Sequence, residues 1–288
     1  MAYCSKTILL LLLLTVSSFV IAQKPPLIQM PIPSDLRALV KEAADQAVKE
    51  EEQQASFYRF RMRRETKTYK LDRELIELKQ GYVARTLLWQ DRELTEQERA
   101  DDDAKLAKLI TDQDEQKRIF SRQQEDASRV MRLVKALPDG VIYTFDEYET
   151  LNNRDTYKLK FIPNPKFFPT ARETIVFKSA EGHLWIDCKA HTVVKLEGEL
   201  VRDINIGWGF LGHIDKGGKV ELEQAEVSTG HWRITKLNTE ATGNAFLFKS
   251  IAIWQHQTAT DFVLVPDNLT IQQAVQLVTI KATDRTAK

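Results

Sequence analysis

The stretch that decides the fold is residues 218–256, GKVELEQAEVSTGHWRITKLNTEATGNAFLFKSIAIWQH. Apolar and polar side chains alternate along it, with a period of two that is typical of β-strands. Strands joined by short turns run antiparallel, because parallel neighbours need a long crossover connection. The stretch therefore predicts three consecutive strands at 218–228, 231–241 and 244–256, with turns at Gly217-Gly218, Thr229-Gly230 and Gly243-Asn244.

The alternating pattern continues on both sides of this stretch. Asp139-Gly140 opens it, and Asn152-Asn153 and Glu181-Gly182 mark further turns. The additional predicted strands are 141–150, 155–163, 173–178, 183–189 and 192–203, with a further short strand at 261–265. No helical pattern separates these strands, so the sequence argues against a parallel α/β sheet.

Three segments before residue 140 complete the predicted elements. Ser34-Asp35 caps a helix that runs to about Gln54. Its apolar stripe consists of Leu36, Leu39, Val40, Ala43, Ala44 and Ala47. Residues 56–89 alternate again and predict a two-stranded hairpin. Thr95 and Glu98 form a capping box ahead of a long polar helix, which breaks near Thr111 and ends at Leu137.

Together these elements predict an α+β fold. We expect one strongly curved antiparallel sheet of about ten or eleven strands, covered by helices. Residues 34–280 are expected to form a single domain that carries the polar helical insert at 92–137. A proline-rich lead-in at 23–33 precedes the domain, and a tail at 281–288 follows it.

Residues 1–22 have the three parts of a secretory signal peptide. Lys6 supplies the positive charge, an apolar run from Ile8 follows, and Val20 and Ala22 stand three and one residues before the expected cleavage at Gln23. The run is shorter than the roughly 20 residues that span a bilayer. We therefore expect a cleaved signal peptide and a periplasmic protein.

The cysteines and the charge restrict the possible partners. Of the two cysteines, Cys4 lies in the signal peptide, so Cys188 alone remains and a disulfide framework is excluded. No cysteine stands at the cleavage site, so we expect no lipid anchor. The formal net charge is +0, which argues against a nucleic-acid partner, because such partners need concentrated positive charge.

Gly207-Trp208-Gly209-Phe210-Leu211-Gly212 matches the dinucleotide pattern G-x-G-x-x-G. That site needs the glycines to open a helix whose N-terminus holds the pyrophosphate. A strand is expected after this motif, so we predict no nucleotide binding. The glycines are expected to bend a strand or to form a loop that carries Trp208 and Phe210.

Other polar groups give no clear catalytic or metal site. His183, Asp187, Cys188 and His191 contain suitable zinc ligands. On a strand, however, Cys188 points away from His183 and Asp187, and zinc needs three or four converging ligands. Two carboxylate pairs, Glu197/Glu199 and Glu221/Glu223, are expected on wet strand faces. We predict no metal, no cofactor and no enzymatic activity.

The sheet instead carries a surplus of apolar bulk, with large side chains on both faces of 244–256. Two interpretations remain open: a core beneath the helices, or a groove between sheet and helices that takes an apolar ligand. The candidate groove residues are Phe177, Trp185, Trp208, Phe210, Trp232, Phe246, Phe248 and Trp254.

Several of these segments resemble exported bacterial proteins of the LolA/LolB-like group, which sorts outer-membrane lipoproteins. The resemblance lies in Trp185-Ile186-Asp187, residues 193–198 and 207–212, Gly230-His231-Trp232 and residues 246–249, and in the order of helix, hairpin, helical insert and antiparallel strands. It covers roughly residues 34–280.

The resemblance implies an open half-barrel with helical lids that carries lipid or lipoprotein acyl chains. Shielding a chain from water is worth about 0.8 kcal/mol per methylene. A sensor that binds a membrane-associated protein on a similar half-barrel is the alternative. The family's cavity arginine has no assigned counterpart here, because Arg59, Arg61 and Arg63 all lie on the first predicted strand.

Overall fold

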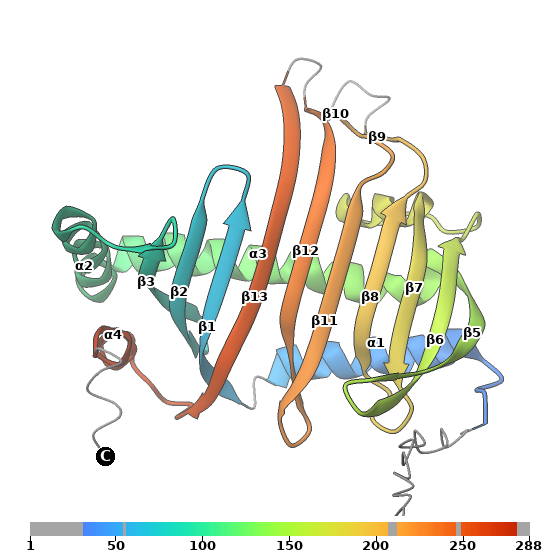
Figure 1. Ribbon diagram of the computed structural model, residues 1–288, viewed down its shortest axis with the longest axis horizontal. Helices are drawn as coiled ribbons and strands as arrows, with labels where there is room; N and C mark the ends of the chain where they lie inside the picture. The colour runs from blue at the N-terminus through green and yellow to red at the C-terminus, as the bar shows by residue number, and fades with distance from the viewer. Residues whose placement is uncertain (1–30, 54–55, 207–211, 246–248, 281–288) are drawn as a thin grey trace, which may run out of the picture.

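A computed structural model describes residues 31–53, 56–206, 212–245 and 249–280 (Figure 1). Within these ranges, thirteen strands form one open sheet in which every pairing is antiparallel. The strand order is β4-β3-β2-β1-β13-β12-β11-β8-β7-β6-β5, with β10 paired to β12 and β9. The prediction of a single antiparallel sheet covered by helices is confirmed.

The strands are β1 (Phe57–Thr66), β2 (Lys70–Leu78), β3 (Gly81–Trp89), β4 (Arg92–Glu93), β5 (Val141–Leu151), β6 (Arg154–Pro163), β7 (Ala180–Asp187), β8 (Val193–Leu200), β9 (Ile204–Ile206), β10 (Gly212–Ile214), β11 (Lys219–Ser228), β12 (His231–Ala245) and β13 (Lys249–Val265). The helices are α1 (Leu36–Gln53), α2 (Glu96–Thr111), α3 (Gln113–Gly140) and α4 (Ile271–Thr279), with a 3-10 helix, η1, at Glu173–Lys178.

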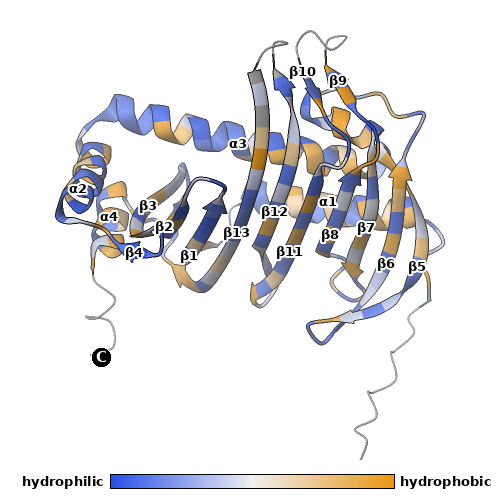
Figure 2. Cartoon of the chain, turned by 45° about the horizontal axis from the view of Figure 1, so that its top comes forward, coloured by the Kyte–Doolittle hydropathy of each residue, from blue (hydrophilic) through white to orange (hydrophobic). Residues whose placement is uncertain are grey.

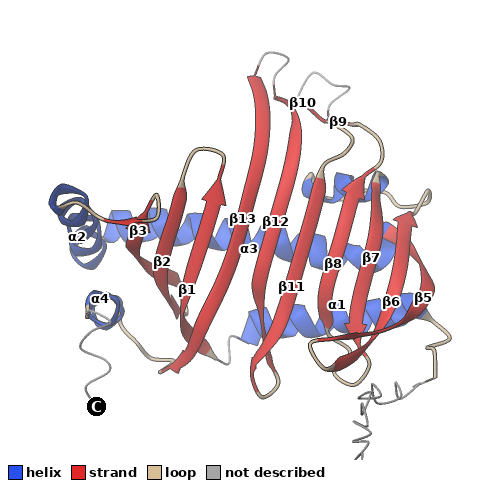
Figure 3. Ribbon diagram, in the orientation of Figure 1, coloured by secondary structure: helices blue, strands red, loops and turns tan. Residues whose placement is uncertain are grey.

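Helices α1 and α3 contact each other, and both run across the strands behind the sheet in the view of Figure 3. The predicted capping box at Thr95 and Glu98 starts α2. The predicted break near Thr111 is also confirmed, since Asp112 ends α2 and its side chain accepts a hydrogen bond from Glu115 N to start α3. Among the described residues, no helix combines the length and apolar character needed to cross a bilayer.

A row of leucines defines what we call the inner face of the sheet. Leu159, Leu184, Leu196, Leu222 and Leu237 pair one after another across β6, β7, β8, β11 and β12. Leu159 and Leu184 are fully buried and belong to the same core cluster as Leu39 and Val40 of α1. Polar residues alternate with such positions along the strands, as the colours in Figure 2 show. The opposite side is the outer face.

A second core lies on the outer face at the other end of the sheet. Arg64 of β1 pairs with Gln257 and so lies on the inner face. Arg59 is five residues earlier on β1, an odd number, so it lies on the outer face, and Ile76 of β2 pairs with Arg59. Ile76 therefore points outward, and it packs with residues of α2, α3 and α4. Five strand-to-strand steps separate β2 from β8, and at about 20–25° each the accumulated twist exceeds roughly 100°. This twist allows α3 to meet opposite faces of the sheet at its two ends.

Two glycines predicted as turns lie inside strands. A Cβ atom on Gly182 would be 1.9 Å from the Glu197 carbonyl oxygen, and one on Gly243 would be 2.2 Å from that of His213. These glycines therefore mark close backbone approaches within β7 and β12. The predicted turns at Glu181-Gly182 and Gly243-Asn244 are wrong.

Two further element predictions are also wrong. Residues 56–89 form three strands, because β2 lies between the two predicted ones. Residues 173–178 form η1 instead of a strand, although their apolar side chains favour strands. Here tertiary packing overrides local preference, since Phe177 lies against Gly140 and makes an edge contact with Phe167.

We predict that Leu184→Ala lowers the free energy of unfolding by about 2–5 kcal/mol, because it leaves a cavity in a fully packed core. Urea unfolding followed by circular dichroism measures the change. Ile162→Ala, at an exposed position on β6, serves as the control and should change stability by no more than about 0.5 kcal/mol. Equal effects of the two substitutions would contradict this description of the core.

Candidate functional site

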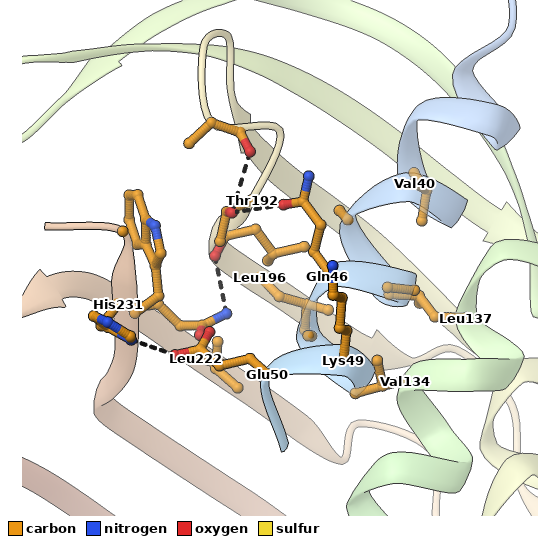
Figure 4. A pocket seen from close by; sticks show the side chains of 18 of the residues that line it. Val40, Gln46, Lys49, Glu50, Val134, Leu137, Thr192, Leu196, Leu222 and His231 are labelled. Carbon is orange, nitrogen blue, oxygen red and sulfur yellow. Dashed lines mark hydrogen bonds and ion pairs between the residues drawn. The ribbon is translucent and has the colours of Figure 1, made fainter. Parts of the chain in front are cut away.

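A cavity of about 480 Å³ lies between α1, the C-terminal half of α3 and the inner face of β8 and β11 (Figure 4). Its size falls in the range of small-molecule pockets. It is lined by Val40, Ala43, Ala44, Gln46, Ala47, Lys49, Glu50 and Gln53 of α1, Val134 and Leu137 of α3, Ala190, Thr192, Val193 and Leu196 around the start of β8, Leu222 and Gln224 of β11, and Gly230, His231 and Trp232 around the start of β12.

The cavity exists because the stripe of α1 changes from large to small side chains. Leu39 and Val40 fill the space above the sheet, whereas the next positions carry Ala43, Ala44 and Ala47. Beneath them, Leu196 and Leu222 are only half-buried, although their neighbours in the leucine row, Leu159 and Leu184, are fully buried. The cavity floor is therefore apolar surface that no protein side chain fully covers.

Polar groups surround this apolar floor. Gln224 Nε2 donates a hydrogen bond to the Val193 carbonyl oxygen at 2.9 Å. Thr192 Oγ1 lies 3.3 Å from Gln46 Oε1 and so connects the wall of the cavity to α1. Figure 4 shows Lys49 and Glu50 on the next turn of the same helix. An apolar floor with a polar rim suits an amphiphile.

An ion-pair cluster at the end of α1 fixes the helix to the sheet. Arg233 Nη1 lies 2.7 Å from Glu50 Oε1, and Arg233 Nη2 donates to the Ser56 carbonyl oxygen at 3.0 Å. The same guanidinium lies 3.6 Å from Glu77 and 4.8 Å from the centre of the Tyr58 ring. Burial raises the pKa of Glu77, although Arg233 and a hydrogen bond from Tyr58 N oppose the shift.

His231 adds to this cluster at the mouth of the cavity. Its Nδ1 lies 3.8 Å from Glu50 Oε1, and its Nε2 lies 3.2 Å from Ser56 Oγ. One carboxylate of α1 therefore contacts two side chains of β12. This arrangement positions the last turn of α1 over the cavity.

The turn between β7 and β8 forms another wall, and Asp187 organises it. Its Oδ1 accepts hydrogen bonds from Lys189 N at 2.8 Å and from Ala190 N at 2.7 Å, and its Oδ2 accepts one from Arg154 at 3.0 Å. Burial opposes ionisation of this carboxyl, but these hydrogen bonds hold its pKa below the usual range. Asp187 thereby positions Ala190 and Thr192 at the cavity.

The structure brings together only some of the predicted groove residues. Trp232 borders the cavity, and it clusters with Trp185, which lies on the outer face between Lys158 and Lys195. Phe177, a residue of η1, packs in the inner-face core. The groove residues Trp208, Phe210, Phe246 and Phe248 lie outside the described residues.

Trp254, the remaining predicted groove residue, lies on the outer face, where its ring centre is 4.1 Å from that of His256 with the two rings tilted. The groove assignment of all eight residues stays a prediction. The alanines of α1 that line the cavity are the signal in the sequence, but their spacing also fits an ordinary apolar stripe.

The other candidate groups lie away from the cavity. Arg59, Arg61 and Arg63 point to the outer face and pair with carboxylates, among them Glu74 at 3.6 Å and Asp261 at 3.8 Å. Cys188 is buried in the inner core, where burial raises its thiol pKa to about 11. Among the described residues, no group of three or more His, Cys, Asp or Glu side chains could hold a metal ion.

We predict that Asp187→Asn lowers the free energy of unfolding at pH 7 by about 1–3 kcal/mol, because charge-assisted hydrogen bonds are weakened. The folded-state pKa lies below the unfolded value of about 3.9. The stabilisation is therefore fully present above the unfolded-state pKa and is lost as the pH falls through the folded-state pKa. Urea unfolding between pH 3 and 8 should show the difference between wild type and variant shrinking only below about pH 4.

The matched control is Asp45→Asn on the exposed surface of α1, which should change stability by less than about 0.5 kcal/mol. A difference between wild type and Asp187→Asn that grows with acidity would contradict the assigned direction of the pKa shift.

Comparison with models of protein families gives no match, and comparison with curated proteins gives none either. Among solved structures, the chain is similar to one described as an outer membrane lipoprotein-sorting protein domain from Vibrio parahaemolyticus, at 10% identity and a TM-score of 0.33, over 83% of this chain and 98% of the other.

Two further solved structures are similar. A DUF1329 family protein from Desulfovibrio piger is 13% identical, with a TM-score of 0.29, over 80% of this chain and 95% of the other. A LolA superfamily protein from Nitrosomonas europaea is 12% identical, with a TM-score of 0.27, over 78% of this chain and 95% of the other.

Proposed function

We propose that this protein is a binding protein that shields the acyl chain of a lipid or lipoprotein in the cavity beneath α1. The observation that carries the proposal is the half-exposed floor of Leu196 and Leu222 beneath the alanines of α1. Covering such a floor with a chain removes apolar surface of both partners from water, at about 25 cal/mol per Å².

A carrier role fits the polar groups around this floor. Glu50, Arg233 and His231 are engaged with one another at the end of α1, which suits them to hold a helix in place. The chain is proposed to act in the periplasm after removal of residues 1–22, with residues 34–280 as one binding unit. A long acyl chain in water costs about 10 kcal/mol, and the cavity lowers that cost during transfer.

We predict that Leu222→Asp reduces the affinity for a fluorescent fatty acid at least tenfold, because the new carboxylate would be buried against the chain. Ile162→Asp places the same carboxylate at an exposed position on β6 and should leave the affinity unchanged. Fluorescence titration measures both, and circular dichroism verifies that both variants are folded.

Ala47→Phe provides a second test that adds no charge. It fills the space between α1 and the sheet, and it should also reduce uptake at least tenfold. Unchanged uptake in both Leu222→Asp and Ala47→Phe would refute this cavity as the acyl site. A wild-type protein that takes up no lipid would refute the carrier proposal and favour a sensor for a membrane-associated protein, which crosslinking would then identify.

A further inference from the structure

The inner face continues beyond the cavity toward β1 and β2. The row that contains Leu222 and Leu237 extends to Gln257 of β13 and then to Arg64 of β1. Figure 1 shows these four strands in this order. Arg73 of β2 pairs with Met62, two residues from Arg64 on the same side of β1. The two arginines are therefore diagonal neighbours on the inner face, about 7–8 Å apart at the backbone.

These arginines lack counter-ions within the described part of the chain. Arg64 donates to Gln257 Oε1 from Nε at 3.3 Å and from Nη2 at 3.1 Å, and this partner is neutral. Neither Arg64 nor Arg73 has a described carboxylate oxygen within 4.0 Å of its guanidinium. The arginines of β1 on the outer face, in contrast, are all paired with carboxylates.

The surroundings are apolar, which makes the missing counter-ions costly. Met62, Leu71 and Leu75 share this face of β1 and β2 with the two arginines by register, and all three are buried. The rings of Phe60 and Phe262 stack nearby at 5.0 Å.

One carboxylate is close to this site. Asp102 of α2 accepts hydrogen bonds from Thr86 N at 3.2 Å and from Thr86 Oγ1 at 3.1 Å, and Thr86 of β3 is the register partner of Arg73 of β2. Its described hydrogen bonds are to Thr86 and not to either arginine. Two half-buried cations without a paired anion favour an anionic ligand that accepts several N–H donors.

We propose that Arg64 and Arg73 bind the anionic headgroup, a phosphate or carboxylate, of the amphiphile whose acyl chain occupies the cavity. This inference rests on the proposed function. Three strand spacings of about 4.8 Å separate β1 from β11, so the headgroup would lie about 14 Å from the cavity floor. Leu237 and the aliphatic part of Gln257 lie in the row between the two sites. The chain would therefore cross from a cationic site to an apolar one along a single face.

Isothermal titration calorimetry of the whole protein with three probes tests the proposal. The probes are decyl phosphate, decanol and inorganic phosphate. The variants are Arg64→Gln/Arg73→Gln and, as a control with the same change in net charge on the outer face, Arg61→Gln/Lys219→Gln. Wild type should bind decyl phosphate at least about tenfold more tightly than decanol. Arg64→Gln/Arg73→Gln should bind decyl phosphate only as tightly as wild type binds decanol. The control variant should still bind decyl phosphate more tightly than decanol.

The outcomes separate the two proposals. Equal affinities of wild type for decyl phosphate and decanol would overturn the headgroup site and leave the acyl cavity intact. Binding of inorganic phosphate as tight as that of decyl phosphate, lost in Arg64→Gln/Arg73→Gln, would assign the arginines to a free anion and overturn the headgroup. Binding of neither decyl probe would refute the acyl cavity and, with it, this inference.

Discussion

The structure depends on the burial of one face of an open antiparallel sheet. The leucine row from Leu159 to Leu237 supplies an apolar strip across five strands, and an open sheet cannot bury such a strip against itself. Helix α1 covers the strip at β6 and β7 with Leu39 and Val40. Where α1 changes to alanine, the cover becomes incomplete, and the cavity is the result. Fold and candidate site thus have one origin, which is the volume of the side chains on α1.

The twist of the sheet explains why the helices divide into two groups. Helix α3 is nearly straight across the sheet in Figure 1, whereas the strands beneath it rotate. Its C-terminal half therefore meets the inner face near α1, and Phe120 near its start meets the second core with α2 and α4. Between the two cores, from residue 121 to 130, most side chains of α3 are exposed. These residues of α3 therefore belong to neither core.

Local chemistry made much of this fold predictable. The capping box at Thr95, the break near Thr111 and the hairpin turns at Asn152-Asn153 and Gly230 depend on neighbouring residues only, and all four are present. The misplaced turns at Gly182 and Gly243 fail for the opposite reason. Their glycines respond to carbonyl groups that come close only in the folded sheet. A glycine needed for close approach cannot be distinguished from a turn glycine by sequence alone.

The candidate site was less predictable because it is defined by differences between chemically similar residues. Five arginines lie on β1 and β2. Register separates Arg59, Arg61 and Arg63, which have carboxylate partners, from Arg64 and Arg73, which have none in the described part of the chain. The aromatic residues were the more conspicuous signal, yet Trp185 and Trp254 lie on the outer face.

Small residues and unpaired charges both reduce the stability of an isolated fold, through lost packing and uncompensated desolvation. Among the described residues they occur here on one face of the sheet, whereas Arg59, Arg61 and Arg63 on the outer face are paired with carboxylates. That asymmetry is the argument for a ligand: an amphiphile would supply, in one molecule, the apolar contacts that α1 omits and the negative charge that the arginines lack.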